Sequence, residues 1–137
     1  MEKIKSRLIA LAFLFGCALT VTCIAADSFH ETYMTTEQAK KKFESQLFVA
    51  EKFKAGDRKL RGKMAADLVS KKSLVGKPLA SIRETLGTPD GYFENDSIPA
   101  YIISPDVTKR DTWQLIFLPD KDWKKVDEVK IHKNCCS

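Results

Sequence analysis

The sequence predicts an α+β fold in which helices pack on one face of a three-stranded antiparallel sheet, with an extra helix near the N-terminus. Between residues 35 and 86, apolar residues recur every three or four positions, which is the period of an amphipathic helix. After Asp90 they alternate along the chain, which is the period of a strand. Helices followed by a meander of strands favour helices stacked on an antiparallel sheet.

The first 25 residues are typical of a secretory signal peptide. Three Lys or Arg precede an apolar run, and Cys23-Ile24-Ala25 closes the run with a cleavage pattern after Ala25. Two rival interpretations stay open: Leu14-Phe15-Gly16-Cys17 resembles a lipobox, which makes Cys17 a candidate lipidation site, and the run is long enough to span a membrane. We expect an exported protein, either secreted, periplasmic or associated with the outer membrane.

The rest of the chain has room for one domain. We divide it into an N-terminal extension with an amphipathic helix at 26–56, an α+β domain at 57–133 and a tail at 134–137. Cys135 and Cys136 are adjacent, which excludes a disulfide framework but leaves open free thiols, a strained vicinal bridge or intermolecular bonds. A metal site built from these two cysteines and His132 lacks a fourth ligand, so we expect no metal.

In the N-terminal extension, one helix is predicted from about Thr35 to Lys54. Thr35 and Gln38 have the spacing of a capping box. The spacings of four, four and three predict a single buried face made of Ala39, Phe43, Leu47 and Ala50.

Two further helices are predicted before the sheet. Asp57 is placed to cap a helix over residues 57–71, whose buried stripe is Leu60, Met64 and Leu68. Pro78 fits the start of a helix of about two turns, and Gly87 and Pro89 fit its end. The buried face of this second helix is predicted to be Leu79, Ile82 and Leu86.

Three strands are predicted in the segments 99–104, 112–118 and 126–133. In the second, Trp113, Leu115 and Phe117 share one face. In the third, Val129 and Ile131 share a face opposite to Glu128, Lys130 and His132.

Charge is unevenly distributed. The whole chain has a formal net charge of +5, but residues 40–77 hold twelve basic and four acidic residues, whereas residues 78–137 are net −2. This charge predicts either solvated helix faces or a basic face that meets an anionic membrane surface or an acidic partner. The candidate binding residues are basic side chains and the two tryptophans, namely Lys40, Lys41, Lys42, Arg58, Lys59, Arg61, Lys63, Trp113 and Trp123.

The stretch around Gly76-Lys77 raises the question of a phosphate-binding loop. Such a loop needs Gly five residues earlier and Ser or Thr after the Lys, but Lys71 and Pro78 stand there. A nucleophilic triad also needs a histidine base, and the two histidines, His30 and His132, lie near the two ends of the mature chain. We therefore expect no catalysis, no cofactor and no nucleic-acid partner.

The stretch LVGKPLASIRETLGTPD, followed by WQLIFLPDKDWKKVDEVKI, resembles the BamE-like (SmpA/OmlA) family of small outer-membrane lipoproteins. The residues that carry the resemblance are Leu74, Gly76, Ile82, Leu86, Gly87, Pro89, Tyr101 and Phe117. The resemblance covers residues 64–132 and implies two helices against a three-stranded sheet. It also implies a non-catalytic scaffold in outer-membrane protein assembly or envelope integrity, with a protein partner in the envelope. The same layout is shared by secreted β-lactamase-inhibitor proteins, so a hydrolase inhibitor is the alternative.

Overall fold

The computed structural model describes residues 33–106 and 111–134. Along the chain its elements are β1 Tyr33–Met34, α1 Thr36–Phe43, α2 Ala50–Ala55, α3 Arg58–Ser70, α4 Leu79–Leu86, β2 Ala100–Ile102, β3 Trp113–Pro119 and β4 Val126–Lys133. The strands form one open antiparallel sheet in the order β1-β4-β3-β2. The α+β class is confirmed, but the three-stranded sheet is wrong by one strand. The extra strand, β1, spans only two residues and gives no alternating pattern.

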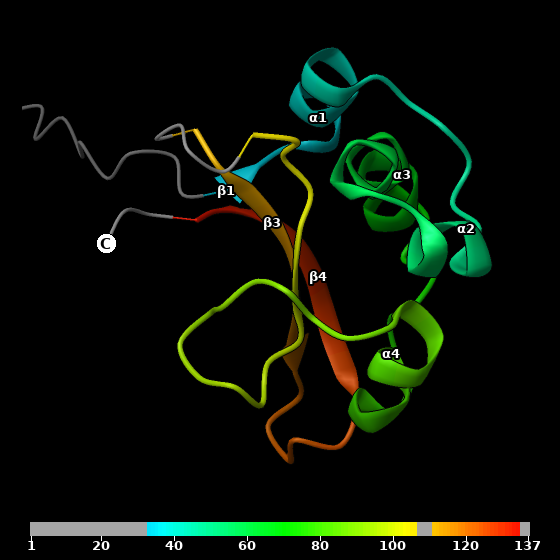
Figure 1. Cartoon of the computed structure of the whole chain (residues 1–137). Helices are drawn as coiled ribbons and strands as arrows, with labels where there is room; N and C mark the ends of the chain where they lie inside the picture. Colours follow the sequence, from blue (N-terminus) through cyan, green and yellow to red (C-terminus); the bar gives the residue numbers. More distant parts are fainter. Residues whose placement is uncertain (1–32, 107–110, 135–137) are drawn as a thin grey trace, which may run out of the picture.

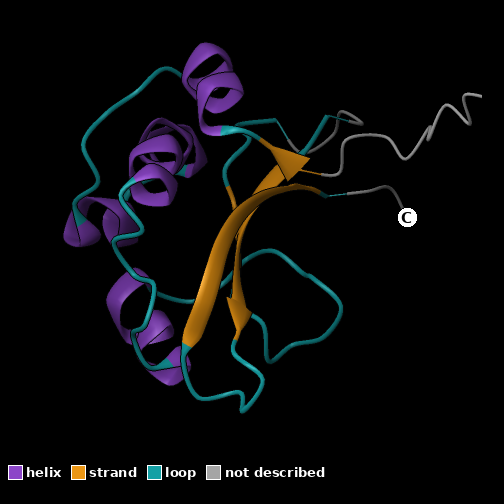
Figure 2. Cartoon of the chain, turned by 180° about the vertical axis from the view of Figure 1, so that it is seen from behind, coloured by secondary structure: helices purple, strands orange, loops and turns teal. Residues whose placement is uncertain are grey.

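The sheet has helices on one side and a long loop on the other. Figures 1 and 2 show all four helices on the same face of the sheet, while the loop between α4 and β2 crosses the opposite face. The core lies between helices and sheet, where Tyr101, Leu115 and Phe117 are fully buried. Ala39 and Phe53, from the predicted N-terminal extension, belong to this same core.

The single helix predicted from Thr35 to Lys54 is wrong. The capping box at Thr35 is confirmed, but α1 ends at Phe43, and Glu44 has a φ of 70°. The next residues run along α3, because the Gln46 N–H donates to the Lys63 carbonyl at 2.8 Å and the Phe48 N–H donates to Asp67 Oδ2 at 2.9 Å. Leu47 is 67% exposed instead of buried. Hydrogen bonds to another helix thus override the helical period of the sequence.

Helix α3 runs through the centre of the helical layer. Asp57 caps it as predicted, since its carboxylate accepts the Leu60 N–H at 2.8 Å. Met64 and Leu68 are fully buried. Gly62 makes room for the sheet: a Cβ there would lie 2.7 Å from the Ile103 carbonyl oxygen.

The predicted ends of α4 are confirmed. Pro78 is the residue before its first turn, and the chain leaves it at Gly87 with a φ of 88°. Gly76 also has a positive φ, 81°, where the chain turns toward α4. The Tyr101 hydroxyl donates to the Gly87 carbonyl at 2.8 Å and so ties the end of α4 to β2.

The strand periods are confirmed for β4, which has the predicted limits 126–133. In β3, however, both faces are buried, because Gln114 and Ile116 on the side away from the helices are also fully covered. The loop that crosses this outer face explains the difference. Its Gly91 N–H donates to the Ala100 carbonyl at 2.9 Å, which holds the loop against β2.

Gly62→Ala should destabilise the protein. In an ordinary helix interior this change is worth up to about 1 kcal/mol of added stability. Here the new methyl group would collide with backbone of the sheet, so we expect the free energy of unfolding to fall by about 1–3 kcal/mol. Urea denaturation measures the effect, with Ser70→Ala at the exposed end of α3 as the control. A Gly62→Ala variant more stable than the parent would contradict the close approach.

Candidate functional site

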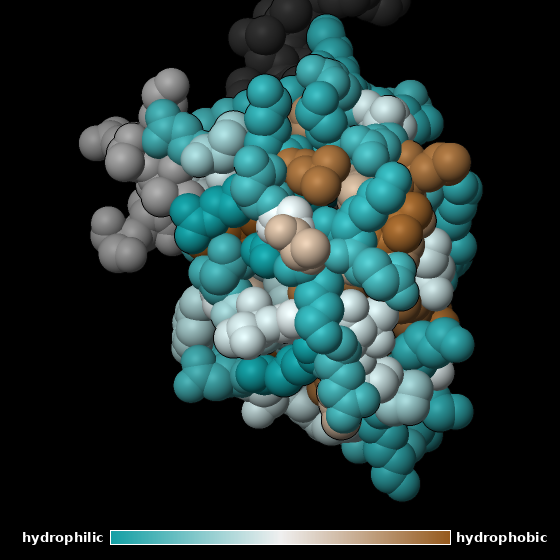
Figure 3. Space-filling view, turned by 45° about the vertical axis from the view of Figure 1, so that its right-hand side comes forward, coloured by the Kyte–Doolittle hydropathy of each residue, from teal (hydrophilic) through white to brown (hydrophobic). Residues whose placement is uncertain are grey.

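Most of the predicted basic binding residues are neutralised within the fold. Ion pairs join Lys40 to Glu37, Lys42 to Asp111, Lys63 to Glu44, and both Arg58 and Arg61 to Asp90. The neighbouring cation holds the pKa of Glu44 and that of Asp111 below the ordinary range. Of the seven predicted basic residues, Lys41 and Lys59 are exposed without an ion pair among the described residues. Figure 3 shows hydrophilic side chains over most of the helical side of the molecule, with small hydrophobic areas between them.

Arg61 is a structural residue. Its guanidinium lies 5.5 Å from the Phe53 ring centre and 5.9 Å from that of Tyr101. Its Nε donates to the Phe53 carbonyl at 3.3 Å, and its side chain is only 13% exposed. Burial raises the pKa of the Tyr101 hydroxyl, which the Arg61 charge opposes.

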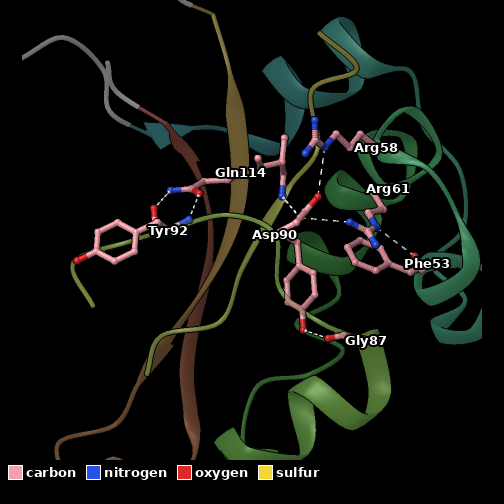
Figure 4. Close-up of polar contacts among 9 residues, drawn as sticks. Phe53, Arg58, Arg61, Gly87, Asp90, Tyr92 and Gln114 are labelled. Carbon is pink, nitrogen blue, oxygen red and sulfur yellow. Dashed lines mark hydrogen bonds and ion pairs between the residues drawn. The ribbon is translucent and has the colours of Figure 1, made fainter. Parts of the chain in front are cut away.

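Asp90 forms ion pairs with two arginines of α3. Its carboxylate lies 3.2 Å from Arg58 Nε and 3.3 Å from an Arg61 terminal nitrogen, and it accepts the Ile102 N–H at 2.9 Å (Figure 4). Asp90 lies three residues after Gly87, the C-cap of α4. The conspicuous Leu-Gly-Thr-Pro-Asp stretch therefore positions a carboxylate that joins α3 to β2, and this contact could not be read from the sequence spacing.

The prediction that Trp113 contributes to an exposed binding face is wrong. Trp113 is 8% exposed and belongs to the core, because its face of β3 is covered by the helices. Its indole N–H donates to Asp111 Oδ1 at 2.7 Å, so the buried polar group is satisfied. Trp113 is therefore inaccessible to a partner.

The outer face of the sheet carries a polar and aromatic cluster. The buried Gln114 amide binds both backbone groups of Tyr92, accepting its N–H at 3.2 Å and donating to its carbonyl at 2.7 Å (Figure 4). His132 Nδ1 lies 3.4 Å from Gln114 Nε2, and the rings of Phe93 and Tyr33 pack on His132 at 4.7 and 5.4 Å. Burial lowers the pKa of His132, while the Glu94 carboxylate acts in the opposite direction.

The turn between β3 and β4, residues 120–125, is called the Trp123 turn below. It presents Trp123 to solvent with 50% of its surface exposed. The Asp120 carboxylate accepts the N–H groups of Lys124 and Lys125 at 2.8 and 3.2 Å, and these bonds lower the pKa of Asp120. Backbone bonds from Trp123 to the Asp120 carbonyl, and from Asp120 to the Lys125 carbonyl, close the turn.

The backbone at Trp123 is unusual. Its φ is 56°, a left-handed conformation that costs a residue other than glycine on the order of 1–3 kcal/mol. The turn is also anchored from outside, since the Leu79 N–H donates to the Lys124 carbonyl at 2.9 Å. The result is a large exposed indole on a backbone with little freedom. Of the predicted binding residues, Trp123 thus has the geometry of a preformed contact.

Other kinds of site have no support in the described segments. Residues 33–106 and 111–134 contain no group of three or more His, Cys, Asp or Glu that could hold a metal ion. No helix within these residues is long and apolar enough to cross a bilayer. Cys17, the candidate lipidation site, and Cys135 and Cys136 lie outside the described residues.

Arg61→Gln and Lys59→Gln should behave differently although the residues are two positions apart. Arg61→Gln leaves Asp90 with one cation fewer in a half-buried site, so we expect a loss of about 1–3 kcal/mol. Lys59 is exposed, so Lys59→Gln should change stability by less than about 0.5 kcal/mol. Urea midpoints of the two variants measure this, and equal values would show that Arg61 has no structural role.

Stability should decrease as the pH falls through about 6.5, the ordinary pKa of histidine. Because the folded pKa of His132 is lowered, the unfolded chain takes up the proton first. Protonation also turns Nδ1 into a donor facing the Gln114 Nε2 donor. We expect a lower urea midpoint at pH 5.5 than at pH 7.5. His132→Gln should reduce this difference, and an unchanged difference in this variant would refute the assignment.

The residues that carry the family resemblance do meet in the fold. Leu74, Ile82, Leu86, Tyr101 and Phe117 are all buried, and Gly76 and Gly87 have positive φ angles. No family model, no curated protein and no solved structure matches the chain. The BamE-like identity therefore stays a prediction.

Proposed function

We propose that this chain is an exported, non-catalytic binding module of the cell envelope that contacts a partner protein through the Trp123 turn. The observation that carries the proposal is the half-exposed Trp123 on a turn closed by hydrogen bonds. Tryptophan is enriched among the residues that dominate binding energy at protein interfaces. A turn whose backbone is already fixed loses less conformational freedom on binding.

The resemblance to BamE-like lipoproteins supports the type of role. A small domain of helices on an antiparallel sheet, exported and lacking a proposed cofactor, suits a scaffold in outer-membrane protein assembly or envelope integrity. The same layout suits a secreted or periplasmic inhibitor of a hydrolase. In both cases a rigid surface feature would engage another protein, and the identity of that protein distinguishes the two roles.

Crosslinking next to Trp123 tests the proposal. A benzophenone amino acid at position 122, beside the indole, should capture a partner in intact envelopes. Trp123→Ala should reduce the capture about tenfold or more, as expected when a central aromatic contact is lost. Asp120→Ala should also reduce it, because the indole remains but the carboxylate that fixes the turn is gone.

The matched control is Tyr92→Ala, which removes another exposed aromatic ring from the outer face of the sheet. This variant should keep the capture. Barrel-assembly components among the captured proteins would support the scaffold role, and a single soluble hydrolase would support the inhibitor role. Capture that is unchanged in Trp123→Ala, or absent altogether, would refute a contact through this turn.

A further inference from the structure

Four lysines lie in or next to the Trp123 turn. Lys121, Lys124 and Lys125 belong to it and are exposed. Lys77 lies beside them, in the segment before α4. Pro78 and Lys125 form an isolated antiparallel β-bridge, and the Lys77 carbonyl accepts the Val126 N–H at 2.9 Å. Residues far apart in the sequence thus contribute lysines to the end of the sheet that carries the exposed indole, and these four lysines are called the rim below.

These cations lack ion-pair partners among the described residues. The Asp120 carboxylate is occupied by the N–H groups of the turn, so its acceptor capacity is directed inward. Asp122 and Asp127 are the exposed acidic neighbours in the turn and at the start of β4, and neither forms an ion pair with a described residue. The four lysines and three aspartates, with Asp120 counted, leave a net charge of +1 at this pole. On the helical side, in contrast, most of the predicted basic residues are paired.

We infer that the partner of the Trp123 turn presents an acidic protein surface around the place where the indole binds. This inference rests on the proposed function and adds the chemistry of the partner. A central aromatic residue with a charged rim is the usual anatomy of a specific interface. Lysines at the rim attract an acidic partner during encounter and select against basic ones.

An acidic protein fits this pole better than a lipid surface does. Binding in the plane of a membrane requires a sizeable apolar area besides basic residues. Trp123 is the only exposed large hydrophobic residue of the turn, and the others of the described residues, Tyr33, Leu47, Val49 and Tyr92, lie outside it. One indole among lysines suits insertion into a pocket bordered by carboxylates.

Poly-L-glutamate is a suitable probe, and the chain provides its own reporter. Its two tryptophans differ in access, since Trp113 is buried and Trp123 is half exposed. Acrylamide should therefore quench mainly Trp123. We expect polyglutamate to protect Trp123 from quenching at low ionic strength, and the protection should decrease as salt screens the rim charges.

Charge reversal distinguishes the effect of the rim lysines on binding from the effect of the net charge of the protein. The double change Lys121→Glu and Lys124→Glu should weaken polyglutamate binding about tenfold or more. These side chains take no part in the bonds that close the turn, so the melting temperature should stay near that of the parent. The matched control is Lys52→Glu with Lys54→Glu, exposed residues of α2 that change net charge equally and should cost less than about threefold.

Three results would overturn the inference. They are no protection of Trp123 at low salt, equal losses in the two double variants, or stronger protection by phosphatidylglycerol vesicles than by polyglutamate. The test is distinguishable from that of the proposed function. If the benzophenone at position 122 captures a protein equally well from both double variants, the contact through the turn stands and the acidic partner is refuted.

Discussion

The ion pair of Arg61 with Asp90 joins the helical layer to the sheet. Arg61 belongs to α3, its guanidinium touches a ring from α2 and a ring from β2, and Asp90 follows α4. Asp90 in turn accepts a backbone N–H of β2. One ion pair thus fixes four segments relative to one another. It lies where water is partly excluded, so loss of either partner leaves a charge poorly compensated.

This constraint also explains how the charges are distributed. The basic residues of the first half meet acidic residues that come much later in the sequence, as Arg58 and Arg61 meet Asp90 and Lys42 meets Asp111. The net charge of +8 over residues 40–77 is therefore partly cancelled by folding, although the sequence presents it as a basic block. The surface that stays basic is set by which of the described lysines form no ion pair. At the Trp123 turn that choice follows from Asp120, whose carboxylate binds backbone instead of a lysine.

Features governed by near neighbours in the sequence were predictable. The caps at Thr35 and Asp57 and the end of α4 at Gly87 depend on contacts within a few residues. Features governed by distant contacts were not. The break after Phe43 depends on hydrogen bonds to α3, and the burial of Gln114 depends on a loop that crosses the outer face. For the candidate site, the sequence singled out both tryptophans, but only the fold could separate the buried one from the exposed one.

The two tryptophans differ in how far the fold accounts for them. Trp113 is explained by the fold itself, because its ring fills the core and its indole N–H binds Asp111. Trp123 is not explained in this way. Its ring is half exposed, and its left-handed backbone costs free energy that glycine or asparagine would largely avoid. The half of the indole that faces solvent adds nothing to the stability of the folded chain. Its burial against another protein would remove apolar surface from water, which makes the Trp123 turn the strongest candidate for a contact surface among the described residues.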